Sequence, residues 1–148
     1  MIRSQTTITE FFNLKSTLPP HESRIDAKKE ITVKIVHYSD AEPKYFDAEG
    51  VKGVTGRVVI GKADGADNFC MRFFELSEGG YSPEHFHDWE HEIVIHSGKG
   101  EVLCQGEWKP VTKGHVIFIP GNETHQLRNA GEDPLVFACL IPSGVPEL

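Results

Sequence analysis

The sequence predicts an all-β protein, a β-sandwich or small barrel, preceded by an N-terminal extension. Short apolar runs recur along the chain, and turn signals rich in glycine, proline and asparagine separate them. No run carries the sustained 3.6-residue period of a long helix. At 148 residues the chain has the length of one domain. We therefore expect an extension over residues 1–30 and a β-barrel domain over residues 31–148.

The first predicted strand is ITVKIVHY, residues 31–38, where Ile31, Val33 and Ile35 alternate with polar residues. Further strands are predicted over residues 54–61, 68–76, 91–98, 100–106, 115–120, 124–129 and 134–142. The intervening segments, QGEWK at 105–109 among them, are predicted turns.

Composition excludes several classes of function. The formal net charge of −7 argues against a nonspecific surface for nucleic acid or anionic membranes. No apolar run is long enough to cross a bilayer, and residues 1–30 do not form a secretory signal. Cys70, Cys104 and Cys139 are odd in number and lie among apolar neighbours, as reduced thiols do. We expect a cytoplasmic protein.

Histidines are concentrated in HFHDWEHEI, residues 85–93. His85, His87 and His91 are evenly spaced, so in a strand they would share one face. With His125 from a later strand they could surround one divalent transition ion, such as Fe, Mn, Ni, Cu, Co or Zn. Isolated histidines in strands are usually surface or hydrogen-bonded core residues, and His21, His37, His96 and His115 are read that way.

Two segments resemble the conserved motifs of the cupin family. GYSPEHFHDWEHEIVIHSGKG (80–100) is similar to the first motif, and GHVIFIPGNETHQLRN (114–129) is similar to the second, with His125 and Asn129 at the expected intervals. The resemblance covers most of residues 54–142. It implies a double-stranded β-helix, the jelly-roll barrel of small cupins, with a metal in its mouth.

The residue that supplies the third metal ligand distinguishes two forms of the first cupin motif. Many cupins place a glutamate there, whereas HxHxWEHE resembles the four-histidine subgroup, in which His91 is the ligand. Shared parity with His85 and His87 favours His91. The turn at residues 88–90 could break this alternation, so Glu92 is the competing ligand.

Other residues are candidates for roles beside the ion. Glu90 and Glu92 could act as a base or orient the histidines. Arg72 could clamp a substrate carboxylate, although a surface position opposite Met71 and Phe73 is the favoured interpretation. Cys104 could lie near the ion. Four further residues could form apolar walls of a pocket: Phe74, Phe118, Leu127 and Phe137.

The leading functional hypothesis is a metal-dependent enzyme acting on a small organic acid or carbonyl compound. Dioxygenase, decarboxylase, lyase and isomerase chemistry are all compatible with the resemblance. The alternative is a module that binds a metal and a small ligand without turnover. Small cupins are often homodimers, and the strand at residues 31–38 could supply the paired edge.

The extension raises another alternative. QTTITEFF, residues 5–12, resembles the peptide with which replication and repair proteins bind a sliding clamp. One helical turn would place Ile8, Phe11 and Phe12 on one apolar face, following Gln5. Such a tail would make the barrel a clamp-interacting protein.

Overall fold

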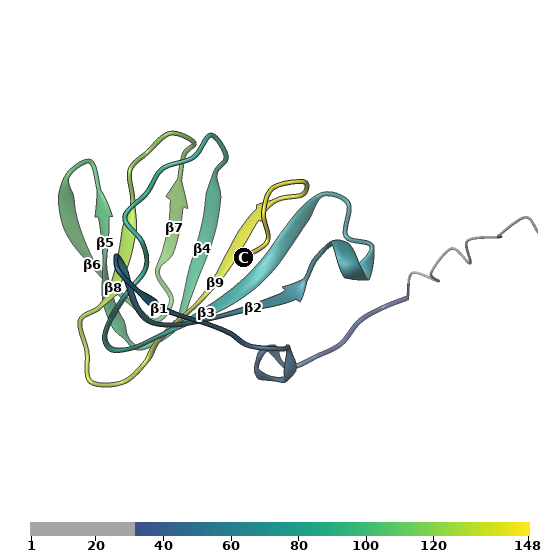
Figure 1. Ribbon diagram of the computed structural model, residues 1–148, viewed down its shortest axis with the longest axis horizontal. Helices are drawn as coiled ribbons and strands as arrows, with labels where there is room; N and C mark the ends of the chain where they lie inside the picture. Colours follow the sequence, from purple (N-terminus) through teal and green to yellow (C-terminus); the bar gives the residue numbers. More distant parts are fainter. Residues whose placement is uncertain (1–31) are drawn as a thin grey trace, which may run out of the picture. The chain divides into compact units, whose positions relative to one another are not determined.

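The computed structural model describes residues 32–148, which form an all-β domain (Figure 1). Its strands agree with the predicted fold class. In chain order they are β1 (Lys44–Ala48), β2 (Val51–Ile60), β3 (Phe69–Tyr81), β4 (His91–Ser97), β5 (Lys99–Cys104), β6 (Glu107–Thr112), β7 (Val116–Ile119), β8 (Gln126–Asn129) and β9 (Leu135–Pro142). Two short 3₁₀ turns, η1 (Tyr38–Asp40) and η2 (Lys62–Asp64), are the helical elements of the described residues.

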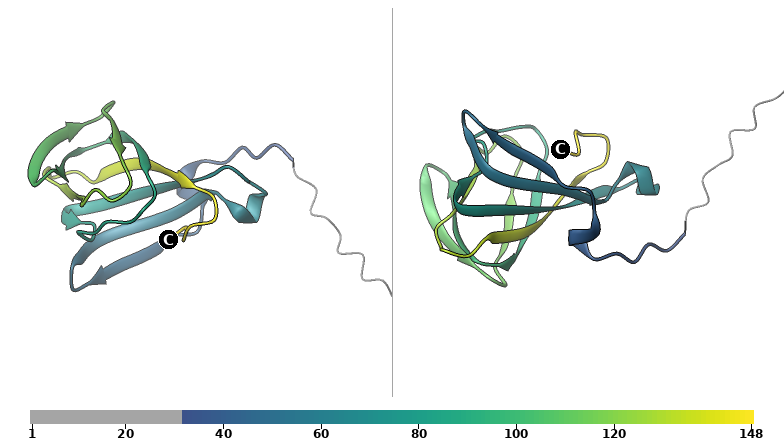
Figure 2. Two further views of the ribbon diagram at one scale, coloured as in Figure 1. Left: turned by 90° about the horizontal axis from the view of Figure 1, so that it is seen from above. Right: turned by 60° about the horizontal axis from the view of Figure 1, so that its bottom comes forward.

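The strands form one antiparallel sheet that curls around an interior, as Figures 1 and 2 show. The strand order is β6-β5-β8-β3-β9-β4-β7, and β2 joins β3 and carries β1. The long strand β3 pairs with β2, β8 and β9. It therefore joins the β1–β2 hairpin to the rest of the sheet. This curled jelly roll is the predicted double-stranded β-helix.

The core lies inside the curl because side chains alternate along each strand. In β4, Ile93 and Ile95 are each 1% exposed, whereas Glu92 and Val94 face outward. In β3, Cys70 and Leu76 point inward in the same way. One continuous apolar cluster therefore supports the inner wall.

The predicted strand at residues 31–38 is wrong. Residues 32–37 have no regular secondary structure, and Val33 and Ile35 are 90% and 94% exposed. The alternation of these residues is not sufficient for a strand, because none of them pairs with the sheet. The described part of this segment is therefore not an edge of this chain's own sheet, and its pairing with a second copy stays a prediction.

Two strands are missing from the sequence-based assignment. β1 is short and mostly polar, and it pairs with β2 alone. β6 includes Glu107, Trp108 and Lys109, which were assigned to a turn, and it carries Pro110. Proline is tolerated here because β6 is an edge strand of the sheet.

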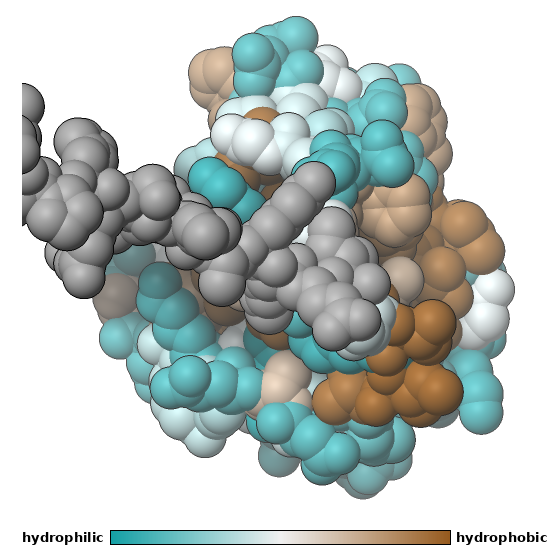
Figure 3. Space-filling model, turned by 90° about the vertical axis from the view of Figure 1, so that its right-hand side faces the viewer, coloured by the Kyte–Doolittle hydropathy of each residue, from teal (hydrophilic) through white to brown (hydrophobic). Residues whose placement is uncertain are grey.

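Several large hydrophobic side chains lie on the surface of the domain. Val116 and Phe118 of the edge strand β7 are 74% and 62% exposed, and Val94 pairs with Val116 on the neighbouring strand. The face shown in Figure 3 also carries hydrophobic residues among hydrophilic ones.

The clamp-like peptide lies outside the described residues and stays a prediction. Within the described part of the chain, no helix is long and apolar enough to cross a membrane.

Candidate metal centre

The four predicted histidines converge at one end of the interior. His85 and His87 lie in the irregular segment between β3 and β4, and His91 is the first residue of β4. His125 directly precedes β8 and forms an isolated β-bridge with His85. Two backbone hydrogen bonds, from His85 N to His125 O (3.2 Å) and from His125 N to His85 O (2.9 Å), join the segments that carry them.

The cluster has the dimensions of a metal site. One nitrogen from each ring lies within 4.8 Å of the others. Nitrogen ligands about 2.0–2.1 Å from an ion are at most about 4.2 Å apart. The spread of the four nitrogens is therefore close to that of ligands around a single ion.

Three of the imidazoles are oriented by backbone carbonyl groups two residues away. The Nδ1 atoms of His85, His87 and His125 are 2.9, 2.8 and 2.8 Å from the carbonyl oxygens of Pro83, Trp89 and Glu123. A carbonyl can only accept, so each Nδ1 carries the proton and donates it. Each Nε2 then presents a lone pair, as a metal ligand must.

The Nε2 atoms face one another inside the cluster. Those of His87 and His91 are 2.8 Å apart, and the buried Nε2 of His125 has no hydrogen-bond partner among the described residues. A buried nitrogen without a partner is costly. The residues present therefore fit a bound cation.

Burial favours the neutral form of three of these rings, those of His87, His91 and His125. It lowers the pKa of His91 to about 3, with the charges of Arg72 and His125 as further causes. Burial likewise lowers the pKa of His87 and His125, against the raising effect of their hydrogen bonds to Trp89 and Glu123. Neutral imidazoles at physiological pH are available to bind a metal without first losing protons.

His91 differs from the other three because its Nδ1 faces no carbonyl. This atom is 3.5 Å from the Sγ atom of Cys139 and 3.5 Å from an Nη atom of Arg72. The same Nη atom donates a hydrogen bond to Cys139 Sγ at 3.0 Å. Arg72 and Cys139 thus contact the imidazole of His91 on its Nδ1 side, away from the other histidines.

Arg72 is buried, and the favoured interpretation of it as a surface residue is wrong. Its side chain is 9% exposed and lines the pocket above the histidines. The register of β3 places it inward together with Cys70 and Phe74. Apolar residues occupy both faces of this strand, so alternation alone could not assign the inward face.

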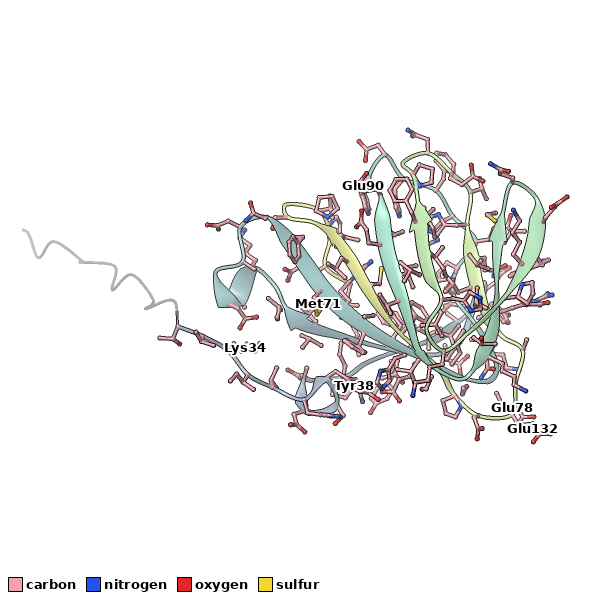
Figure 4. The ribbon with its side chains drawn as sticks, turned by 180° about the vertical axis from the view of Figure 1, so that it is seen from behind. Lys34, Tyr38, Met71, Glu78, Glu90 and Glu132 are labelled. Carbon is pink, nitrogen blue, oxygen red and sulfur yellow. The ribbon has the colours of Figure 1, made fainter. Side chains whose placement is uncertain are left out.

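The glutamates lie elsewhere. Glu92 is exposed on the outer face of β4, opposite Phe118 and Leu140 in register, and does not line the pocket. This placement supports His91 rather than Glu92 as the candidate ligand and gives no support to Glu92 as a base. Glu90 is also exposed, at the end of the barrel opposite Glu78 and Glu132 (Figure 4). No hydrogen bond joins either carboxylate to a described histidine; backbone carbonyls orient three of the four rings instead.

The cavity in front of the histidines has a volume of about 430 Å³. Phe74, Leu127 and Phe137 form part of its wall, as expected. Phe118 does not, because it lies on the outer face and is 62% exposed. Cys104 lies beside a smaller, separate cavity.

Sequence reasoning missed two neighbours of the cluster. Cys139 was assigned only to a predicted strand. Trp89 stacks on His87 with ring centroids 4.0 Å apart. Its place in HFHDWEHEI was a signal that could have identified it. His37, His96 and His115 are exposed, in agreement with their assignment as surface residues.

Comparisons with known proteins identify one family. The model of the family described as "Cupin domain" matches residues 72–141. The structure of the polyketide cyclase RemF from Streptomyces resistomycificus is 35% identical, with a TM-score of 0.72 over 78% of this chain and 82% of that chain. A cupin 2 conserved barrel domain protein from Rhodopseudomonas palustris is 31% identical, with a TM-score of 0.62 over 70% and 71% of the two chains.

A curated relative is similar over a shorter segment. The 1-methylthio-D-xylulose 5-phosphate methylsulfurylase of Rhodospirillum rubrum is 30% identical over 71 residues, which are 48% of this chain and 46% of that protein. The match thus spans less than half of the relative's length.

Proposed function

This chain belongs to the cupin family, and from that premise we propose that it is a metal-dependent enzyme for a small organic acid or carbonyl compound. His85, His87, His91 and His125 would hold one divalent transition ion, drawn from Fe, Mn, Ni, Cu, Co or Zn. The observation that carries the proposal is the set of converging Nε2 atoms, three of them on rings whose Nδ1 is held by a carbonyl.

The donor set favours an anionic or enolate-like partner. Four neutral imidazoles would leave the charge of a divalent ion uncompensated, and no aspartate or glutamate side chain lines the pocket. Such an ion, when bound, would supply Lewis-acid chemistry by polarising an oxygen atom of the substrate. The chain's own part is to orient the four rings and to surround the reacting group with apolar side chains that exclude water.

Dioxygenase, decarboxylase, lyase and isomerase reactions all fit this donor set. The likeness to a polyketide cyclase supports a carbonyl-rich substrate, since polyketides carry many carbonyl groups.

One observation favours the alternative of a binding module without turnover. The pocket lining contains no aspartate or glutamate. A general acid or base would therefore have to be a histidine or a group of the bound compound itself. Loss of a bound compound over time, measured with metal-loaded protein, would distinguish an enzyme from a module that binds and releases the compound unchanged.

The proposal is tested by the metal content of tag-free protein purified without chelators. We expect near-stoichiometric metal by elemental mass spectrometry in the wild type and in His115→Ala, which removes an exposed histidine outside the cluster. Replacement of His125 with alanine should abolish both metal retention and any activity, because it removes a buried ligand.

Glu92→Gln should keep its metal because Glu92 lies on the outer face. Wild-type protein that stays empty when these metals are offered back, or a His125→Ala variant that retains its metal, would refute the proposal.

A further inference from the structure

The pocket that leads to the histidines is almost entirely apolar. Its aromatic walls include Phe46, Phe74, Phe86, Trp89 and Phe137, and most other lining residues are aliphatic. Apart from the histidines, the lining contains a single charged side chain, that of Arg72. A compound that fills this space must therefore be largely hydrophobic.

Arg72 lacks the partner that a buried guanidinium needs. It donates hydrogen bonds to the sulfur of Cys139 at 3.0 Å and to the carbonyl of Glu147 at 3.4 Å, and its buried Nε has no partner among the described residues. The side chain of Glu147 is directed elsewhere, because its carboxylate accepts a hydrogen bond from the backbone of Lys62. The guanidinium carbon also lies 5.1 Å from the centroid of the Phe74 ring.

Other arginines of the barrel do have carboxylate partners. Arg57 forms an ion pair with Glu75, and Arg128 with Glu101. Arg72 is in none of the ion pairs of the described residues, although it is buried. Burying a cation without a counter-charge is costly, and a divalent ion at the histidines would add positive charge to the same cavity.

We propose that Arg72 anchors the carboxylate of a hydrophobic, aromatic-sized organic acid, with the body of the acid against the aromatic walls. This rests on the proposed function for the site of reaction and adds the chemical class of the substrate. Guanidinium and carboxylate form strong, charge-assisted hydrogen bonds, which would also satisfy the unpaired Nε.

The position of Arg72 relative to the histidines orients such an acid. Arg72 lies beside the Nδ1 of His91, whereas the Nε2 of the same ring faces His87. The anion anchor and the candidate metal position are thus separated by about one imidazole ring.

The lining disfavours a sugar phosphate of the kind named for the curated relative. It offers one arginine and no lysine for a phosphate dianion, and its one hydroxyl side chain is that of Ser82. Sugar hydroxyl groups would lose water here without gaining hydrogen-bond partners. Hydrophobic monocarboxylates do not carry this cost.

The inference is tested by calorimetric titration with 2-naphthoate, using naphthalene-2-methanol as a neutral compound of similar shape and glucose 6-phosphate as the polar competitor. In metal-free wild-type protein we expect binding of 2-naphthoate and at least about tenfold weaker binding in Arg72→Gln, as the loss of a charge-assisted pair predicts. Arg128→Gln is the matched control, because it removes an arginine outside the pocket.

Arg72→Lys keeps the charge and should fall between wild type and Arg72→Gln, so it provides a second variant should Arg72→Gln fail to fold. Equal affinity of wild type and the two Arg72 variants for 2-naphthoate would overturn the inference. So would the absence of 2-naphthoate binding up to millimolar concentration, or equal or tighter binding of either comparison compound.

Cobalt uptake, measured on the same samples, separates this inference from the proposed function. Protein that takes up Co(II) but binds 2-naphthoate independently of Arg72 would refute the inference alone. Binding that depends on Arg72 in protein that takes up no Co(II) would refute the proposed function and leave the anion site standing.

Discussion

At the scale of single residues, His91 is a histidine of the cluster whose surroundings strongly lower its pKa. It is 6% exposed and has Arg72 beside its Nδ1, and these surroundings lower its pKa to about 3. The other rings have backbone acceptors, whereas His91 has only the sulfur of Cys139 and the cation. Protonating His91 in the folded state therefore costs more than protonating a free imidazole.

This difference predicts how the stability of metal-free protein depends on pH. The pKa of His91 is about 6.5 in the unfolded chain and about 3 in the folded one, so the unfolded state binds more protons between these values. The free energy of unfolding should be highest above about pH 6.5 and fall below it, by up to about 1.4 kcal/mol per pH unit from this residue.

Urea unfolding of chelator-treated protein at a series of pH values measures this slope. His91→Asn should have a shallower slope below about pH 6.5, whereas His115→Ala should behave like the wild type. An unchanged slope in His91→Asn would contradict the assigned environment of His91.

The convergence of the four histidines was predicted from the sequence, although the even spacing of the first three was an incomplete reason for it. A bend at Asp88 and Trp89 interrupts the strand between His87 and His91, so the shared face is not that of one continuous strand. Arg72 and Cys139 were not predicted as neighbours of His91, because their proximity depends on the pairing of β3 with β9. Pairing between distant strands leaves no local signal in the sequence.

At the scale of elements, the loop before β8, which contains Gly121 and Asn122, fixes the position of the loop that carries His87. The amide of Asn122, a residue with φ of 67°, donates to the carbonyl of His87 at 2.6 Å. A Cβ atom on Gly121 would lie 2.4 Å from the carbonyl oxygen of Asp88. The two loops therefore touch backbone to backbone, and Gly121 is required for this approach.

We expect Gly121→Ala to weaken metal binding without changing any ligand. The added methyl group must displace the backbone at Asp88 and with it the orientation of His87, and displacement of orienting groups typically costs 10–100-fold in metal affinity. Competition titration of Co(II) against a chelator measures the change.

Gly131→Ala is the control, because its Cβ would lie 3.3 Å from the Cβ of Lys99 and 3.6 Å from the nearest backbone atom, the carbonyl oxygen of Lys99, without a severe clash. Unchanged Co(II) affinity in Gly121→Ala would show that the contact does not position His87.

Elements were predicted well where strands are buried on one face and poorly where they are not. Strands β3, β4 and β9 carry the apolar alternation of the inner wall, and each was expected close to its observed position. β1 and β6 lie at the margins of the sheet, where exposed polar residues give little pattern. Residues 32–37, the described part of the predicted first strand, have the pattern but pair with no strand of this chain's sheet.

At the scale of the whole molecule, the edge strand β7 is the place where a second copy could pair. It ends the strand order, and Val116 and Phe118 expose apolar surface beside it. Apolar edge strands are prone to uncontrolled pairing unless they are covered. We therefore propose that the expected homodimer, if formed by sheet pairing, uses β7 instead of residues 31–38.

Light scattering coupled to size-exclusion chromatography measures the oligomeric state. We expect a dimer for the wild type and a monomer for Phe118→Glu, because a buried, unpaired carboxylate at the interface is unfavourable. Val33→Glu, which places the same charge at a 90% exposed position outside the sheet, should remain a dimer. A monomeric wild type would refute the homodimer, and a dimeric Phe118→Glu would place the interface elsewhere.

The carbonyl groups that orient His85, His87 and His125 belong to the main chain, which every residue type provides. Substitutions in the pocket wall can therefore alter the shape and charge of the cavity while the ion site keeps its geometry. Selection for a new substrate can act on residues such as Phe46 or Phe74 without first rebuilding the candidate metal centre. This separation gives one barrel the capacity to acquire different chemistries by few mutational steps.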